Sequence, residues 1–246
     1  MKNYRLKIQY DGTRYRGWQR QKSSAATIQG RIEQVLTRQM GQSVEICGAG
    51  RTDAGVHARE QVANVHLDYE GTPEWLKNSL NEYLPEDIRI LEVELAGERF
   101  HSRLNATGKV YQYRICKKGY FDVFSRQYQW EAEEELDPAR MRRAAELLLG
   151  EHDFAGFCTK ASKKKSTVRR LDAITIREED TALFIRFEGN GFLYNMARIL
   201  TGTLVEIGSG RREISSIEEI FQTGDRSLAG ETAPAKGLTL IRVKYD

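Results

Sequence analysis

Cysteine and histidine are scarce in this chain of 246 residues, which has three of the former and four of the latter. Cys47, Cys116 and Cys158 lie far apart and form no C-x-x-C pair, so neither a disulfide framework nor a zinc site is indicated. We expect all three to be small buried side chains. The histidines show no H-E-x-x-H spacing and no clustering. The sequence therefore predicts no bound metal.

Long apolar runs are also missing. No stretch approaches the roughly 18 residues that cross a bilayer, and the start of the chain leads into an alternating pattern instead of the apolar core of a signal peptide. With 40% hydrophobic residues, the chain can still bury the core of one or two domains. We expect a soluble cytoplasmic protein without a membrane partner.

Positive charge is unevenly distributed, although the net charge is only +3. The first 22 residues contain seven basic side chains and one carboxylate, with aromatic residues between them; the seven are Lys2, Arg5, Lys7, Arg14, Arg16, Arg20 and Lys22. A second basic segment covers residues 160–170 and includes Lys163–Lys165, Arg169 and Arg170. Such segregation suits a polyanion bound on one face, but a charge run can equally be solvated surface.

Residue periodicity predicts the elements of each half of the chain. In the first half we expect strands at 4–10, 44–48, 61–67 and 88–95, and helices that begin after Thr27 and Thr72. In the second half we expect strands at 110–116, 168–177, 182–188 and 238–245. Helices are expected from Asp137-Pro138, over 192–207, and from the capping box Ser215-x-x-Glu218.

Both halves thus follow the order β-α-β-β-α-β, the ferredoxin-like arrangement with helices on one face of a mostly antiparallel sheet. We expect an α+β protein of two such halves, residues 1–105 and 106–246. The junction is placed there because Ala96-Gly97 breaks one strand and Thr107-Gly108 precedes the next. Two halves of this kind would leave a cleft between their sheets.

The most unusual segment is the glycine-rich stretch from Gly48 to Ala58, which fits neither common nucleotide-binding motif. Asp53 occupies the third glycine position of G-x-G-x-x-G, where a carboxylate would repel a pyrophosphate. A P-loop would need Lys and Ser or Thr where Val56-His57 follow. What remains is a loop that places the Asp53 carboxylate near the Arg51 guanidinium. Taken alone, Asp53 could simply be a turn residue that bonds its own backbone.

The string Gly50-Arg51-Thr52-Asp53-Ala54-Gly55-Val56-His57-Ala58 resembles the signature of the TruA family, tRNA pseudouridine synthase A. Further similarities run along the whole chain. They are Tyr10-Asp11-Gly12, Gly17-Trp18-Gln19, Asn81, Leu84-Pro85, Asp87-Ile88, Phe100-His101-x-Arg103, Ala106-Thr107-Gly108-Lys109, Tyr111-x-Tyr113, His152-Asp153-Phe154, Gly189–Met196 and Thr232-Ala233-Pro234-Ala235-x-Gly237-Leu238. The chain departs from the usual pattern at Ser102, Leu104, Asn105 and Val123, which leaves room for a shifted substrate range.

The resemblance implies two ferredoxin-like halves around a basic cleft, a homodimer, no cofactor, and a tRNA substrate modified in the anticodon arm at positions 38–40. It also implies site residues. Asp53 would be the catalytic aspartate, Tyr111 would pack against the flipped base, Arg198 would pair with the carboxylate, and Arg51 would help displace the base. From pattern alone, Tyr111 could be an aromatic core residue and Arg198 an ordinary surface arginine.

Two other functions stay open at this point. A non-catalytic RNA-binding or RNA-folding protein could use the same basic cleft. A metal-free hydrolase with Asp53 as base fits less well, because the chain has no nucleophile signature such as G-x-S-x-G.

Overall fold

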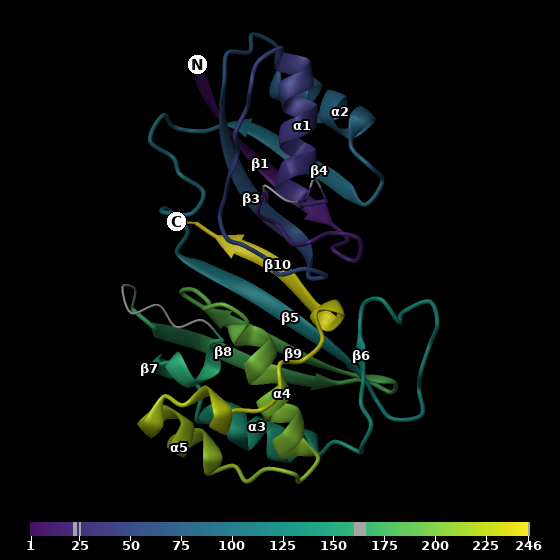
Figure 1. Ribbon diagram of the computed structural model, residues 1–246, viewed down its shortest axis with the longest axis vertical. Coiled ribbons are helices and arrows are strands. Elements are labelled where there is room, and N and C mark those ends of the chain that lie inside the picture. The colour runs from purple at the N-terminus through teal and green to yellow at the C-terminus, as the bar shows by residue number, and fades with distance from the viewer. Residues whose placement is uncertain (22–23, 25, 160–165, 246) are drawn as a thin grey trace. The chain divides into compact units, whose positions relative to one another are not determined.

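The computed structural model describes residues 1–21, 24, 26–159 and 166–245, and the chain divides into two compact units (Figure 1). Unit 1 consists of Met1–Thr107 together with Thr239–Asp246, and unit 2 consists of Gly108–Leu238. The sequence-based division kept the last strand with the second half, whereas the contacts place it in unit 1. The reason is its pairing with an early strand of the chain.

Unit 1 is a mostly antiparallel sheet with two helices. Its elements are β1 (Lys2–Tyr10), α1 (Ile28–Met40), β2 (Cys47–Gly48), β3 (His57–Leu67), α2 (Pro73–Tyr83), β4 (Ile88–Leu95) and β10 (Leu238–Lys244). The strands follow the order β4-β1-β3-β10, with β2 also on β3. β1 is antiparallel to β3 and β4, while β10 is parallel to β3.

Local signals explain where the two helices of unit 1 begin and end. The Thr27 hydroxyl accepts the Gly30 N–H at 3.2 Å, and the Thr72 hydroxyl accepts the Trp75 N–H at 3.2 Å. Both are N-cap hydrogen bonds, and α1 ends at Gly41, which has a φ of 67°. The inward faces carry fully buried apolar side chains, namely Ile28, Ile32, Leu36, Leu76 and Leu80. The expected helices are confirmed.

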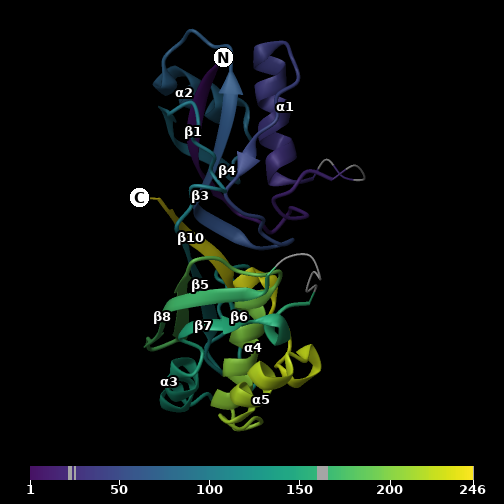
Figure 2. The same ribbon diagram turned by 90° about the vertical axis from the view of Figure 1, so that its left-hand side faces the viewer.

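Unit 2 is built mainly on antiparallel strands. Its elements are β5 (Gly108–Cys116), β6 (Trp130–Glu131), α3 (Pro138–Glu146), β7 (Gly150–Asp153), β8 (Val168–Glu178), β9 (Ala182–Gly189), α4 (Met196–Gly208) and α5 (Ser216–Thr223). The strand order is β5-β9-β8-β7, with β6 parallel to β5. Figure 2 shows α3, α4 and α5 gathered on one side of this sheet. The predicted α+β class is confirmed.

Several boundaries differ from the expectations. The helix α4 begins at Met196 and not at residue 192, because the preceding Asn195 has a φ of 61°, which is not helical. Ser215 precedes α5 but makes no side-chain cap hydrogen bond, so the predicted capping box is absent. The short strands β6 and β7 were not predicted. The expected strand at 44–48 is reduced to Cys47–Gly48.

The cysteine prediction is right for two residues and wrong for one. Cys116 and Cys158 are buried, whereas Cys47 is exposed because the two-residue strand that carries it lies off the main order of the sheet. Within the described ranges, no cluster of three or more His, Cys, Asp or Glu side chains could hold a metal ion. No described helix has both the length and the apolar character needed to span a membrane.

Candidate active site

Asp53 lies on the loop between β2 and β3, and the segment that follows β1 holds this loop by its backbone. The Trp18 N–H donates to the Thr52 carbonyl at 3.0 Å, and the Gly55 N–H donates to the Tyr15 carbonyl at 3.3 Å. The Val56 N–H donates to the Asp53 carbonyl at 3.2 Å and closes a turn. Asp53 is half-buried. Hydrogen bonds to Thr52 and Gly55, on either side of Asp53 in the chain, therefore fix its position.

Glycines make this close approach of two backbone segments possible. A Cβ on Gly12 would lie 2.0 Å from the Val56 carbonyl oxygen, and one on Gly17 would lie 2.6 Å from the Thr52 carbonyl oxygen. Gly17 also has a φ of +89°, which L side chains rarely adopt. The two short glycine motifs after β1 thus have a structural role in supporting the Asp53 loop.

A buried polar network joins the same loop to β1 and β3. The Tyr10 and Thr52 hydroxyls are 2.8 Å apart, and Gln61 Nε2 donates to the Gly50 carbonyl at 3.0 Å. Burial raises the pKa of Tyr10 to about 12, although its hydrogen bonds to Thr52 and Gln61 act in the opposite direction. Tyr10 therefore stays protonated at physiological pH and serves as a structural hydrogen-bonding group.

Arg51 is exposed on the same loop, and its orientation is set by a glutamine from the supporting segment. Its Nε donates to Gln19 Oε1 at 3.0 Å, and Gln19 Nε2 in turn donates to Gln29 Oε1 at 2.7 Å. The predicted neighbours Arg51 and Asp53 thus share one loop, with the buried Thr52 between them.

Arg198 lies on α4 in unit 2 and is held by two acceptors, so its guanidinium has a defined orientation. Its Nε donates to the Ala233 carbonyl at 2.7 Å, and its Nη1 donates to Asn195 Oδ1 at 2.9 Å. The Ala233 N–H donates back to the Arg198 carbonyl at 3.2 Å. Arg198 is half-buried. These contacts argue against an ordinary solvated arginine.

The segment Gly230–Ala233 is itself fixed along α4. The Gly230 N–H donates to the Thr203 hydroxyl at 2.9 Å, and the Glu231 N–H donates to Glu206 Oε1 at 2.8 Å. A Cβ on Gly202 would lie 2.0 Å from the Glu231 carbonyl oxygen. The carbonyl that orients Arg198 is therefore part of a closely packed contact.

Tyr111 and Tyr113 point to the same face of β5 but have different surroundings. Tyr113 is fully buried, and its hydroxyl donates to the Pro234 carbonyl at 2.7 Å. Burial raises the pKa of Tyr113 well above its ordinary value. Tyr111 is 7% exposed, and its ring meets that of Phe192 edge-on with centroids 4.9 Å apart. Tyr113 is a core residue, and Tyr111 is the more available of the two.

Ion pairs neutralise much of the N-terminal basic cluster. Arg5 pairs with Glu94 at 2.6 Å and Lys7 with Glu92 at 2.7 Å. Arg14 pairs with Asp87 at 2.9 Å, and Arg20 bridges Glu33 and Glu45. In the second basic segment, Arg170 pairs with Asp172 at 2.7 Å. Lys22, Lys160 and Lys163–Lys165 lie outside the described residues. Much of the charge of the described N-terminal run is thus paired within unit 1.

Comparison with known proteins places the chain in a family. A family model described as tRNA pseudouridine synthase matches residues 7–105 and 144–246. Over its full length the chain is 47% identical to a protein named tRNA pseudouridine synthase A from Bacillus sp. (strain KSM-64), all of which is covered. It is 42% identical over its full length to tRNA pseudouridine synthase A 2 from Bacillus cereus (strain ZK / E33L), again with all of that protein covered. It is 43% identical to tRNA pseudouridine synthase A 2 from Clostridium tetani (strain Massachusetts / E88), of which 99% is covered.

The chain belongs to the tRNA pseudouridine synthase family. It is accordingly an isomerase that acts on uridine in tRNA. The matched segments include Arg51, Asp53 and Arg198, whereas Tyr111 falls between them.

Some functional contacts of this synthase were missed in the sequence. The supports from Gln19, Asn195 and Ala233 join residues distant in sequence or depend on backbone conformation. Gln19, Asn195 and Ala233 each lie in a segment of the family similarity, and this was the available signal.

Gly17 offers a first test of how the Asp53 loop is held in the synthase. Gly17→Ala should destabilise the fold by about 1–2 kcal/mol through its positive φ alone, and the clash with the Thr52 carbonyl should in addition displace the loop and lower the turnover number at least about ten-fold. Gly41→Ala is the matched control, because Gly41 has a φ of +67° but a Cβ there would meet nothing within 4 Å. Urea unfolding and pseudouridine formation measure both effects. Equal turnover in the two variants would contradict a role for the close approach.

Proposed function

We propose that this chain converts uridines at positions 38–40 of the tRNA anticodon stem-loop to pseudouridine, with Asp53 as the catalytic carboxylate. The observation that carries the proposal is the loop Gly50–Ala58, which combines the family signature with a half-buried aspartate whose loop exchanges hydrogen bonds with the Tyr15–Trp18 segment. Catalysis depends on such fixed geometry, since displacement by about 1 Å can cost a factor of roughly 100.

The reaction itself sets what the site must supply. The N1 to C1′ bond breaks, the uracil turns, C5 bonds to C1′, and the proton on C5 leaves while N1 gains one. No electrons are gained or lost overall, so the proposal needs no cofactor. The carboxylate could attack C1′ and be displaced by C5, as in retaining glycosidases, or it could remove a sugar proton to give a glycal. Both routes require an ionised Asp53.

Arg198 is the cation that we propose for this carboxylate. A nearby guanidinium favours the ionised form of an aspartate and lowers its pKa. The support for this role is the fixed orientation of the Arg198 side chain on its two acceptors, Ala233 and Asn195. A planar guanidinium held in a defined orientation suits the recognition of a carboxylate.

Arg51 and Tyr111 are proposed to handle the base. A uridine within a stem must leave the stack at a cost of a few kcal/mol, and an arginine that fills the gap offsets part of that cost. Arg51 is exposed and adjacent to the Asp53 loop, which suits it to this task. The Tyr111 ring would pack against the extruded uracil, and its hydroxyl could relay the proton lost from C5.

We further propose that the enzyme works as a homodimer in the cytoplasm. Both features rest on the resemblance of the chain to the TruA family. Light scattering at micromolar protein concentration tests the first, and a monomeric mass would count against it.

The position of modification can be tested directly. Transcripts of a tRNA in which uridine 38, 39 or 40 is replaced singly by cytidine should each lose one modification site after incubation with the enzyme, as mapped by carbodiimide adducts and primer extension. Pseudouridine at other positions of the tRNA would contradict the assignment to positions 38–40. Tight RNA binding without any pseudouridine would favour the alternative, a non-catalytic RNA-binding or RNA-folding protein that uses the same surface.

A further inference from the structure

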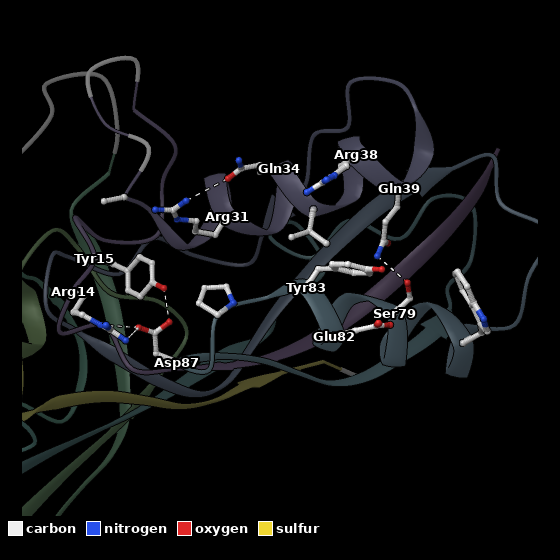
Figure 3. A pocket seen from close by; sticks show the side chains of 14 residues that line it. Arg14, Tyr15, Arg31, Gln34, Arg38, Gln39, Ser79, Glu82, Tyr83 and Asp87 are labelled. Atoms are coloured by element: carbon white, nitrogen blue, oxygen red, sulfur yellow. Dashed lines mark hydrogen bonds and ion pairs between the residues drawn. The ribbon is translucent and has the colours of Figure 1, made fainter.

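A groove of about 890 Å³ lies in unit 1 between α1 and α2, apart from the residues assigned to catalysis. Figure 3 shows Arg31, Gln34 and Arg38 of α1 along one wall and Ser79, Glu82 and Tyr83 of α2 along the other. Arg14, Tyr15 and Asp87 close one end. The groove therefore has cationic, aromatic and amide groups on facing walls.

The two arginines of α1 differ from Arg5, Arg14 and Arg20, which form ion pairs. Arg31 makes a single long hydrogen bond, 3.4 Å, to its neighbour Gln34, and Arg38 makes no hydrogen bond or ion pair with any residue that the structure describes. The two lie seven residues apart on one face, which is a rise of about 10 Å. Arg31 is half-buried and Arg38 is exposed, so two cations line this face at a fixed spacing.

The carboxylates of the groove oppose this charge only in part. Asp87 accepts hydrogen bonds from Arg14 Nε at 3.1 Å and from the Tyr15 hydroxyl, so it is already occupied. Burial, together with this carboxylate, raises the pKa of Tyr15 above its ordinary value. Glu82 is the other acidic residue of the lining. An anion that enters the groove therefore meets two available guanidinium groups.

Two exposed aromatic rings stand in the same lining. Trp75 is 57% exposed and Tyr83 is 59% exposed. Trp75 is supported from behind by Tyr69, with ring centroids 5.9 Å apart and an interplanar angle of 27°. Exposed aromatic rings beside spaced cations form the combination that binds unpaired nucleotides, since every base has a face to stack and every nucleotide carries a phosphate.

One end of the groove is continuous with the support of the Asp53 loop. Tyr15 lines the groove, and its carbonyl accepts the Gly55 N–H of that loop. An RNA bound at Asp53 could thus extend into the groove.

We propose that the groove between α1 and α2 binds a segment of the tRNA outside the anticodon stem-loop. Phosphates would lie against Arg31 and Arg38, and an unpaired base would stack on Trp75 or Tyr83. This inference rests on the proposed function, because it assigns a second contact to the same tRNA substrate.

The charge contribution can be tested with two RNAs. For Arg31→Ala/Arg38→Ala, the Kd of a full-length tRNA transcript should rise on the order of ten-fold, and the slope of log K against log salt should fall in magnitude by roughly 1.4–1.8. Binding and turnover of the isolated anticodon stem-loop should not change. Arg177→Ala/Arg211→Ala is the control, because it removes the same charge from ion-paired surface arginines of unit 2.

The outcomes separate the groove from the proposed function. Unchanged affinity for the full-length tRNA, or an equal loss for both RNAs, or an equal loss in the control would overturn the groove proposal. If the parent protein formed no pseudouridine but the groove variants still lost affinity for full-length tRNA alone, the proposed function would fail and the groove would stand.

Trp75 gives an independent test of the stacking contribution. Trp75→Leu should raise the Kd for full-length tRNA by roughly five-fold or more and leave stem-loop binding unchanged. In the parent, tRNA should quench tryptophan fluorescence, because Trp75 is exposed while Trp18 is buried and Trp130 is half-buried. Most of the quenching should disappear in Trp75→Phe. Quenching of equal size in that variant and in the parent would show that no base stacks on Trp75.

Discussion

Replacing Asp53 by asparagine should abolish pseudouridine formation while tRNA binding and stability stay close to those of the parent. Asparagine has nearly the same shape and can keep the contacts of the loop, but its amide is neither a nucleophile nor a base. The single-turnover rate should therefore fall by a factor on the order of 10⁴ or more. The half-buried position of Asp53 between two held backbone segments makes a large structural effect unexpected.

Two variants show whether such a loss belongs to the reaction. Asp68→Asn makes the same chemical change at an exposed position after β3 and should leave the rate unchanged. Asp53→Glu keeps a carboxylate but moves it by one methylene, so an intermediate rate is expected. A rate for Asp53→Asn within about ten-fold of the parent would exclude Asp53 as the catalytic group.

Replacing Arg198 by lysine should have the second largest effect, although the charge is conserved. The guanidinium donates from Nε to Ala233 and from Nη1 to Asn195 at the same time, and a single ammonium group lacks this fork geometry. We expect the turnover number to fall by a factor on the order of 100. Asn195→Gly should give a smaller loss, because glycine tolerates the φ of 61° but removes one of the two acceptors.

The pH profile separates an electrostatic role of Arg198 from a merely structural one. If the guanidinium lowers the pKa of Asp53, moving the positive charge lets that pKa rise. Activity needs the ionised carboxylate, so the acidic limb of the kcat/KM profile should shift to higher pH in Arg198→Lys. The exposed Arg211→Lys should leave the profile unchanged. A lower rate with an unshifted acidic limb would assign Arg198 to packing alone.

The order of the elements could be predicted from the sequence because it depends on local patterns. Alternation in β1, the N-cap threonines of α1 and α2, and the apolar faces of the helices all act over a few residues. Features that depend on distant partners were missed. The parallel pairing of Thr239 with His57 joins residues far apart in the chain, and no local pattern specifies it.

The candidate site shows the same division. Asp53 and Arg51 were identified because they stand in one specific nine-residue string. The carbonyl of Ala233 that orients Arg198 is a backbone group, and any residue type could supply it. The ion pairs of Arg5, Lys7 and Arg14 could not be predicted for a related reason, since their acidic partners come from β4 and the turn before it. The roles of Asp53, Tyr111, Arg51 and Arg198 stay predictions.

Tritium release from tRNA labelled at C5 of uridine tests the central claim most directly, because C5 loses its proton only when it becomes bonded to C1′. The account predicts release by the parent protein from full-length tRNA, no release by Asp53→Asn, and product that maps to the anticodon stem-loop. Release from no tRNA at all, by a folded protein that binds tRNA tightly, would contradict it.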